Sequence, residues 1–319
     1  MEKGLRGIVT GVEGKTSSVR LDGAEMLRCG LVASIRLVEG GARTSRVAVG
    51  DRVEVARTGP GEGVIEVVET RRTQLARGRD RREQVIAANV DQLAIVTAVR
   101  DPDWRPGFVD RMLCAAQKGG LDPLIVANKV DLLDAGRNDA ARANAAVAVA
   151  RDLECYRKLG YRTVETSAQT GAGLAPLRAA LKDRVTVFSG QSGVGKSSLL
   201  NAIETGLTLT TREVSRGNRK GRHTTSSVSL LPLTGGGYVL DTPGVRSFAF
   251  YDLEPREVGW LFKEVAGLAP SCKYRDCLHL TEPDCAVRYA VESGVVDARR
   301  YASYQRLLAS LDEEEDERG

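Results

Sequence analysis

Long apolar runs are absent from this 319-residue chain, and no stretch approaches the roughly 18 residues that a membrane-spanning helix needs. The N-terminal sequence MEKGLRGIVTGVEG also lacks the apolar core of a secretory signal. We therefore expect a cytoplasmic protein with no membrane partner. The composition, 42% hydrophobic and 28% charged, is typical of a soluble globular chain, and the length suits about two or three domains.

Aromatic residues and histidines are scarce. Residues 1–103 contain no Phe, Tyr or Trp, which excludes base stacking on aromatic rings in that part of the chain. The two histidines, His223 and His279, both fall inside motifs considered below. The net charge of +4 includes a contribution of −5 from the acidic tail 312–319, so residues 1–311 carry +9. This excess favours a polyanionic partner without identifying it.

The chain divides into four parts by pattern. Residues 1–70 show short β segments separated by turn signals, which predicts a small β-barrel or sandwich. Residues 71–84 form an Arg-rich linker, which we expect to be an exposed connector. Residues 85–250 alternate apolar strands with helical stretches, as in a doubly wound α/β domain. Residues 251–319 are mainly helical. The pattern predicts strands at 89–99 and 122–131, helices at 107–120 and 138–160, a β-hairpin at 228–240, and helices near 255–268 and 296–311.

A phosphate-binding loop of the form G-x-x-x-x-G-K-[ST] occupies residues 190–197, between an apolar strand and a helical stretch. Its glycines let backbone N–H groups surround phosphate oxygens at the N-terminus of the helix. We expect Lys196 to reach the β- and γ-phosphates and Ser197 to bind Mg²⁺. The residues expected around the phosphates are Gly190, Gln191, Ser192, Gly193, Val194, Gly195, Lys196, Ser197 and Ser198.

The sequence NKVD at 128–131 follows a predicted buried strand and distinguishes GTP from ATP. Asp131 would accept hydrogen bonds from guanine N1–H and the exocyclic amine, and adenine would leave it unpaired. Such a mismatch supports discrimination of about 10⁴-fold or more. We expect Asn128 to pair with the other edge of guanine and the Lys129 stem to cover the ring, with Val130 between them in the motif.

A third element, TSAQTGAG at 166–173, also follows a predicted strand. In GTPases a Ser-Ala pair at this point offers a backbone N–H to guanine O6. Here the pair is Ser167 and Ala168, and Ala168 would supply the N–H.

Two further elements follow the P-loop. In DTPG, at 241–244, we expect Asp241 to hold the water shell of Mg²⁺ and the Gly244 N–H to sense the γ-phosphate. The preceding segment 215–230 lies where the first switch of a GTPase would be. Either Thr224 or Thr225 would bind Mg²⁺ there, and the sequence does not choose between them.

The order of these elements is a cyclic permutation of the usual GTPase order. Guanine motif, Ser-Ala motif, P-loop, switch Thr and DTPG follow one another along the chain. One active site can be built either way, because the strands remain neighbours when the chain ends move.

Three cysteines and a histidine cluster near the C-terminus as Cys272, Cys277, His279 and Cys285. This set suits one tetrahedral Zn²⁺ with no open position, so the site should be structural. A disulfide with a spare thiol is the alternative, and it fits poorly with a cytosolic chain. The remaining cysteines are scattered and are expected to be reduced thiols.

The motifs GQSGVGKSSLLN, GRHTT, DTPG, NKVD and CKYRDCLHLTEPDCAV closely resemble those of the circularly permuted GTPases of the RsgA type, which assist small-ribosomal-subunit biogenesis. The resemblance covers essentially the whole chain. It implies an N-terminal OB-fold barrel, a circularly permuted G domain and a C-terminal zinc domain. It also implies GTP/GDP, Mg²⁺ and Zn²⁺ as ligands, and the 30S subunit and its rRNA as partners. Assembly factors are further candidate partners, and nothing requires a dimer.

Val245 follows DTPG, where conventional small GTPases have a water-orienting Gln nearby. The resemblance makes His223 the catalytic candidate in its place. Our hypothesis is that His223 is turned away in the free protein and positioned by the ribosome, so that free turnover is slow. The basic segments 71–82 and 212–222 would contact rRNA, or else form a solvated charged surface. The alternatives are a signalling or transport GTPase acting on a protein, and an RNA-binding module with a merely structural nucleotide site.

Overall fold

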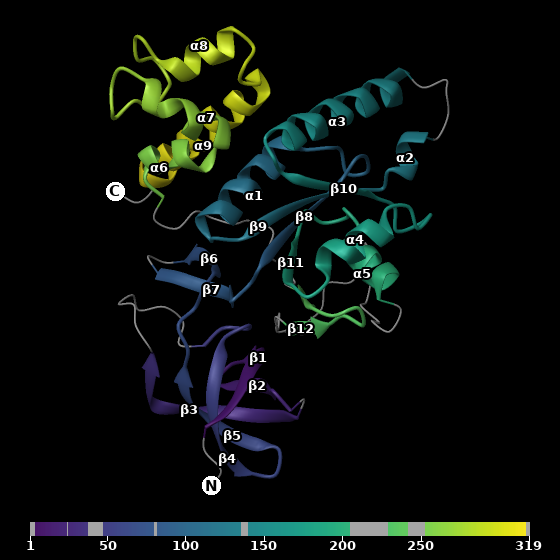
Figure 1. The fold of residues 1–319 in the computed structure, drawn as a ribbon, viewed down its shortest axis with the longest axis vertical. Helices are drawn as coiled ribbons and strands as arrows, with labels where there is room; N and C mark the ends of the chain where they lie inside the picture. Colours follow the sequence, from purple (N-terminus) through teal and green to yellow (C-terminus); the bar gives the residue numbers. More distant parts are fainter. Residues whose placement is uncertain are drawn as a thin grey trace.

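The computed structural model describes residues 4–23, 25–37, 47–79, 82–134, 140–204, 229–241 and 253–316. Three parts follow one another along the long axis of the molecule: an N-terminal barrel, a central α/β domain and a C-terminal helical domain (Figure 1). None of the described helices combines the length and the apolar character that crossing a membrane requires.

The N-terminal part is a closed barrel. Its strands pair in the order β1-β2-β3-β5-β4, and β4 pairs again with β1, which closes the barrel in the topology of an OB-fold. Alternate residues point inward, and β-branched side chains such as Val9, Val53 and Ile65 fill the core. The short β segments predicted for residues 1–70 are confirmed. The strands are β1 (Leu5–Glu13), β2 (Thr16–Leu21), β3 (Met26–Leu37), β4 (Arg52–Gly59) and β5 (Glu62–Val68).

The segment expected as an exposed connector contains a two-stranded antiparallel sheet of β6 (Gln74–Arg79) and β7 (Arg82–Ala88). The strands were not predicted, because an Arg-rich sequence is typical of an exposed linker. The residues on either side of this sheet also make contacts with the barrel. Arg71 pairs with the buried Asp51 at 2.7 Å, and the Asn89 amide donates to the carbonyl of Gly50 at 3.0 Å. The connection between barrel and central domain is therefore a set of specific contacts.

The described part of the central domain contains six strands in the order β10-β9-β8-β11-β13-β12, all parallel except β12. The strand β11 that precedes the P-loop lies near the middle, between β8 and β13. These strands are apolar because helices cover both faces of the sheet. The strands are β8 (Gln92–Ala98), β9 (Asp122–Asn128), β10 (Arg162–Thr166), β11 (Val185–Ser189), β12 (Ser229–Pro232) and β13 (Tyr238–Asp241).

Helices α1 (Pro106–Lys118) and α3 (Ala140–Lys158) pack on one face of this sheet, and α4 (Leu174–Leu181) and α5 (Lys196–Ile203) pack on the other. The short helix α2 (Asp131–Asp134) follows β9. The doubly wound arrangement and the hairpin of β12 and β13 are as predicted.

The C-terminal domain packs against α1 (Figure 1). Its first helix begins with a reciprocal capping box between Glu254 and Glu257. Arg300, with 1% of its side chain exposed, pairs with Asp110 of α1 at 2.6 Å and with Glu264 at 2.7 Å, so buried charges join the two domains. The helices are α6 (Pro255–Leu261), α7 (Lys263–Leu268), the 3-10 turn η1 (Ala269–Ser271), α8 (Ala286–Glu292) and α9 (Ala298–Asp316).

Candidate nucleotide site and metal centre

The nucleotide motifs that the structure describes meet at one edge of the central sheet. Strands β9, β10, β11 and β13 run parallel, so their last residues lie at the same edge. In open α/β sheets, ligands bind at the carboxyl ends of the strands. The residues at these ends are Asn128, Thr166, Ser189 and Asp241.

The P-loop has the backbone that its glycines predict. Gly193 and Gly195 have φ angles of 83° and 93°, which residues with a side chain rarely adopt. A Cβ on Gly190 would lie 2.2 Å from the carbonyl oxygen of Val96, so only glycine fits there. Helix α5 then begins at Lys196, which directs backbone N–H groups toward the loop.

The side chain of Lys196 is held over the P-loop by backbone carbonyl groups of the loop itself. Its ammonium group donates to the carbonyl oxygens of Gly190 at 2.7 Å and Gln191 at 3.0 Å. A phosphate bound in the loop would therefore lie beside this cation. Ser197 follows in the first turn of α5 and is half-buried, whereas Ser198 is exposed.

Asn128 joins the guanine motif to the P-loop. Its side-chain Nδ2 donates to the carbonyl of Val194 at 2.8 Å, and its Oδ1 accepts from the hydroxyl of Thr166 at 3.2 Å. With 1% exposure, the side chain is buried between these partners. The structure thus gives Asn128 a bridging position, and its pairing with guanine stays a prediction.

The rest of the guanine motif is arranged around β10. Lys129 has a positive φ of 66° and donates through Nζ to the carbonyl of Asp101. The Val130 N–H donates to the carbonyl of Thr166 at 3.1 Å, and Asp131 starts helix α2. These contacts fix the motif between β8 and β10.

The Ser-Ala loop is also ordered by local hydrogen bonds. Ser167 is fully buried, and its hydroxyl accepts from the N–H groups of Gln169 at 3.2 Å and Thr170 at 3.1 Å. The loop therefore keeps its turn without a ligand, and Ala168 is partly buried within it.

Four residues expected at the γ-phosphate end of the site lie outside the described residues, namely His223, Thr224, Thr225 and Gly244. Asp241 is the last residue of β13, next to β11, and its role at Mg²⁺ stays a prediction. Its side chain, too, lies outside what is described.

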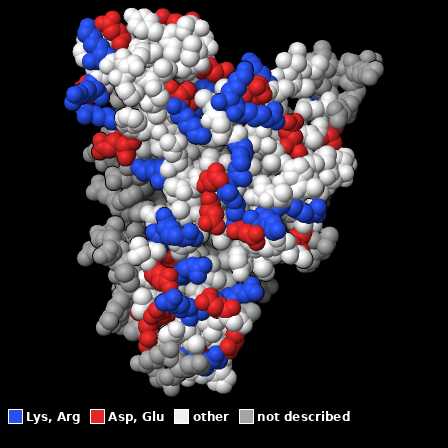
Figure 2. Space-filling model, in the orientation of Figure 1, with Lys and Arg blue, Asp and Glu red and all other residues white. Residues whose placement is uncertain are grey.

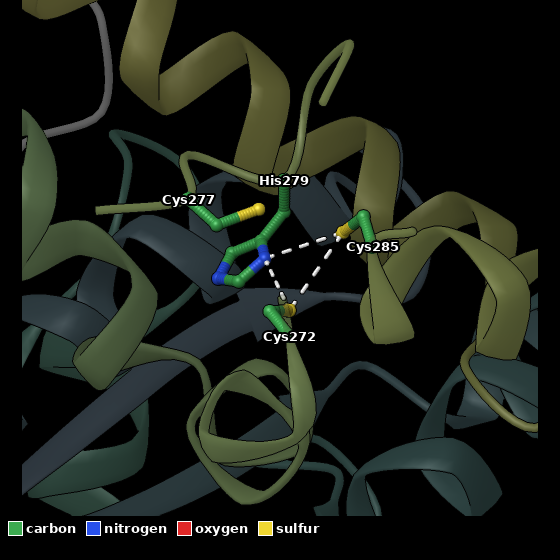
Figure 3. A group of neighbouring side chains, drawn as sticks. All are labelled: Cys272, Cys277, His279 and Cys285. Carbon is green, nitrogen blue, oxygen red and sulfur yellow. Dashed lines mark hydrogen bonds between the residues drawn. The ribbon is translucent and has the colours of Figure 1, made fainter. Parts of the chain in front are cut away.

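The second centre is formed by Cys272, Cys277, His279 and Cys285, whose ligand atoms all lie within 4.8 Å of one another (Figure 3). His279 Nδ1 is 3.4 Å from the sulfurs of Cys272 and Cys285, and these sulfurs are 3.9 Å apart. Tetrahedral zinc, with Zn–S of about 2.3 Å and Zn–N of about 2.0–2.1 Å, implies edges of about 3.8 Å for S···S and about 3.6 Å for S···N. The donor set suits one zinc ion, and the three distances among Cys272, His279 and Cys285 are close to these edges. All the cysteines are free of disulfides.

Burial shifts the pKa of two of these groups, and only the shift of His279 favours metal binding by itself. Burial lowers the pKa of His279, which keeps the imidazole neutral and able to coordinate. Burial raises the pKa of the Cys277 thiol to about 12, and a coordinated metal would hold it as the thiolate. The loop that carries His279 is held from outside, because the Tyr301 hydroxyl donates to the His279 carbonyl at 2.6 Å and the Tyr304 hydroxyl to the Leu278 carbonyl at 2.7 Å.

Comparison with known proteins decides the family. The model of the RsgA GTPase family matches residues 68–251. The chain belongs to the RsgA GTPase family. It is therefore a GTPase, a hydrolase that acts on GTP.

Individual relatives of the RsgA family resemble the chain over nearly its whole length. The small ribosomal subunit biogenesis GTPase RsgA of Chlorobaculum parvum is 42% identical, over 98% of this chain and 100% of the relative. The crystal structure of YjeQ from Thermotoga maritima is 34% identical with a TM-score of 0.76, covering 96% of this chain and 98% of that one. YloQ, described as a circularly permuted GTPase, is 30% identical with a TM-score of 0.72, covering 98% and 96%. The predicted permutation is confirmed.

The sequence analysis assigned no role to several residues that support the nucleotide site and the metal centre. Thr166, which supports Asn128, was detectable as the last residue of a strand. Asp101 acts through its backbone carbonyl, which no side-chain pattern reveals. The carboxylate of Glu282 accepts from the N–H groups of Leu278 at 2.7 Å and Leu280 at 2.8 Å, and thereby orders the metal loop between its ligands.

Proposed function

We propose that this GTPase binds the small ribosomal subunit late in its maturation and uses GTP hydrolysis to leave it. The observation that carries the proposal is the joined site, in which Asn128 links the guanine motif to the P-loop, in a chain that matches small ribosomal subunit biogenesis GTPases over 98% of its length. A signalling or transport GTPase, the alternative from the sequence, is not favoured, since the relatives that match nearly the whole chain are named small ribosomal subunit biogenesis GTPases.

In this proposal the nucleotide lies along the edge of the sheet from Asp131 to the P-loop. Asp131 and the Ala168 N–H select guanine, and the Lys129 stem covers the ring. Ser167 supports this end through the turn that its hydroxyl stabilises. The base is read by groups that would stay buried and unpaired with adenine, which is the physical basis of the selectivity.

At the phosphate end, Lys196 neutralises the β- and γ-phosphates while the P-loop N–H groups hold their oxygens. Ser197 would bind Mg²⁺ and Asp241 would hold its water shell, with Thr224 or Thr225 joining Ser197 in the GTP state. Bound Mg²⁺ supplies charge neutralisation between the β- and γ-phosphates. The Gly244 N–H contacts the γ-phosphate and so reports whether hydrolysis has occurred.

His223 is proposed to orient the attacking water, because Val245 has no polar group for this task. In the free protein the imidazole would be turned away, and the ribosome would bring it to the γ-phosphate. Turnover would then depend on the partner, as it does for GTPases that require an activating protein.

The proposed RNA contact is electrostatic. The barrel has no aromatic side chain for stacking, so its contacts with rRNA would be made to phosphates by Arg and backbone groups. On the face shown in Figure 2, Lys and Arg are interspersed with Asp and Glu from the barrel to the helical domain. The described residues on this face therefore form no single basic stripe, and segments 71–82 and 212–222 remain the proposed contacts. The protein would act as a cytoplasmic monomer, and assembly factors are further proposed partners.

The zinc centre is proposed to have a structural role. Four protein ligands leave no coordination position for chemistry, and the ion would stabilise a domain with a small core of its own. The domain follows the DTPG motif directly in the chain, so we further propose that the γ-phosphate state is passed to it mechanically.

Sedimentation with ribosomal subunits tests the proposal. The full chain, with a non-hydrolysable GTP analogue, is expected to pellet with 30S subunits and not with 50S subunits, and GDP should weaken the association. Equal association in the GTP and GDP states would contradict the proposal that GTP hydrolysis releases the protein from the 30S subunit. Absence of any 30S association would overturn the proposed function.

A further inference from the structure

The segment between β8 and α1, residues 99–105, touches two parts of the nucleotide site. The Asp101 carbonyl accepts a hydrogen bond from Lys129 of the guanine motif. The ring of Pro102 lies beside the P-loop: a Cβ atom built on Gly193 would be 3.7 Å from the Cδ atom of Pro102. The position of this segment, called here the β8–α1 loop, therefore affects both the base end and the phosphate end of the site.

Trp104 anchors this loop to helix α3. Its indole Nε1–H donates to Oδ2 of Asp152 at 2.9 Å, and Asp152 is buried, with 2% of its surface exposed. Indole has one donor and no acceptor, so a partly buried Trp in this position depends on such a partner. The bond fixes the C-terminal end of the loop, three residues from the carbonyl that holds Lys129.

The same carboxylate is held by the C-terminal domain. Arg299 of α9 lies with its Nε 3.1 Å from Asp152 Oδ1, an ion pair rather than an aligned hydrogen bond. Arg299 also donates through Nη1 to Asp110 of α1 at 2.9 Å. The guanidinium is mostly buried, with 17% of the side chain exposed, so the charges are poorly screened.

Helix α9 extends this chain of contacts to the metal loop. The Tyr301 hydroxyl, two residues beyond Arg299, donates to the carbonyl of His279. One helix therefore contacts both the zinc-binding segment and the carboxylate that anchors the β8–α1 loop. This route reaches the nucleotide site at its base end.

We propose that Trp104 and Asp152 are positioning residues for the bound nucleotide, and that Arg299 makes their effect depend on the docked C-terminal domain. The inference rests on the proposed nucleotide site. An anchored β8–α1 loop keeps Lys129 and the P-loop in their binding arrangement, so less order has to be gained when the nucleotide binds. Release of either anchor frees the loop and speeds the departure of GDP.

Dissociation of a fluorescent GDP analogue from the full-length protein tests this inference. Trp104→Phe, which keeps the ring and removes the donor, is expected to speed dissociation about three- to tenfold, the effect of one net hydrogen bond. Arg299→Gln should speed it to a similar extent. In the double variant, the dissociation rate should rise by less than the product of the two single fold-increases, because both residues act through one loop.

Two matched variants serve as controls. Trp260→Phe removes the other tryptophan, which is exposed in the C-terminal domain. Arg151→Gln removes the other arginine at Asp152, which belongs to α3 and is largely exposed. Both should keep wild-type dissociation. In Trp260→Phe protein, Trp104 is the remaining tryptophan, and its fluorescence should change when GDP binds.

The outcomes separate this inference from the function on which it rests. Dissociation from Trp104→Phe within twofold of wild type, or Arg299→Gln no faster than Arg151→Gln, would overturn the inference alone. Wild-type protein that binds no guanine nucleotide would overturn the proposed site and the inference together. Faster release from both variants, with unchanged controls, would support it.

Discussion

The side-chain amide of Asn128 donates a 2.8 Å hydrogen bond to the backbone carbonyl of Val194, and this contact joins the guanine motif to the P-loop. The two residues are 66 positions apart, with Asn128 earlier in the chain. In the permuted order the base-recognition strand β9 precedes the phosphate-binding strand β11 in the chain. In the sheet the two strands lie on either side of β8. The site consequently acts as one unit although its parts are reordered in sequence.

Replacement of Gly195 should disturb this contact directly. A Cβ at this position would lie 2.4 Å from Asn128 Nδ2, and the φ angle of 93° already disfavours a side chain. We expect Gly195→Ala to weaken GTP and GDP binding by about tenfold or more, since the clash separates the two motifs. Equilibrium titration with a fluorescent nucleotide measures this. Gly14→Ala, at a glycine with positive φ and open space around it, should bind like wild type, and equal loss in both variants would contradict the explanation.

Base selectivity should depend on Asp131. Asp131→Asn exchanges a carboxylate acceptor for an amide, which suits the carbonyl of xanthine better than the amine of guanine. We expect the base preference to move from guanine nucleotides toward xanthine nucleotides. Competition between GDP and XDP measures the ratio. An unchanged preference would show that another residue reads the base.

Loss of one zinc ligand should unfold the C-terminal domain. Structural zinc contributes about 10–16 kcal/mol in small zinc-binding peptides, and Cys272→Ser removes one of its four ligands. We expect this variant to lose bound zinc and helical circular dichroism together. Cys155→Ser changes a free cysteine outside the cluster and should retain one zinc per chain. Full zinc content and unchanged melting in Cys272→Ser protein would refute the assigned ligand set.

The buried charges between α1 and α9 should be important for stability. Asp110, with 1% exposure, accepts from Arg300 at 2.6 Å, and its removal leaves buried positive charge without this partner. We expect Asp110→Ala to lower the free energy of unfolding by about 3–5 kcal/mol in urea titrations. Glu165→Ala breaks an exposed pair with Arg157 and should cost less than about 1 kcal/mol. Similar costs for both variants would contradict the role of burial.

Sequence patterns predicted the parts of the site that depend on local chain order. P-loop glycines, NKVD and the Cys/His spacing each specify chemistry within a short segment. The P-loop and NKVD follow strands β11 and β9, as expected, and the four Cys/His side chains lie together. Contacts between distant segments were not predictable, because Trp104 with Asp152 and Asp110 with Arg300 follow no periodic pattern. The β6–β7 sheet was missed since its arginines resemble those of a solvated linker.

GTP hydrolysis with and without purified 30S subunits tests the central claim most directly. The account predicts slow turnover by the free protein and a rise of about 10³-fold or more with 30S subunits, the range of activation for comparable GTPases. His223→Ala should bind GTP normally and lose about 10²-fold or more of the stimulated rate. Full stimulation of that variant would remove His223 from the mechanism. Wild-type turnover that does not respond to 30S subunits, or is absent under both conditions, would contradict the claim itself.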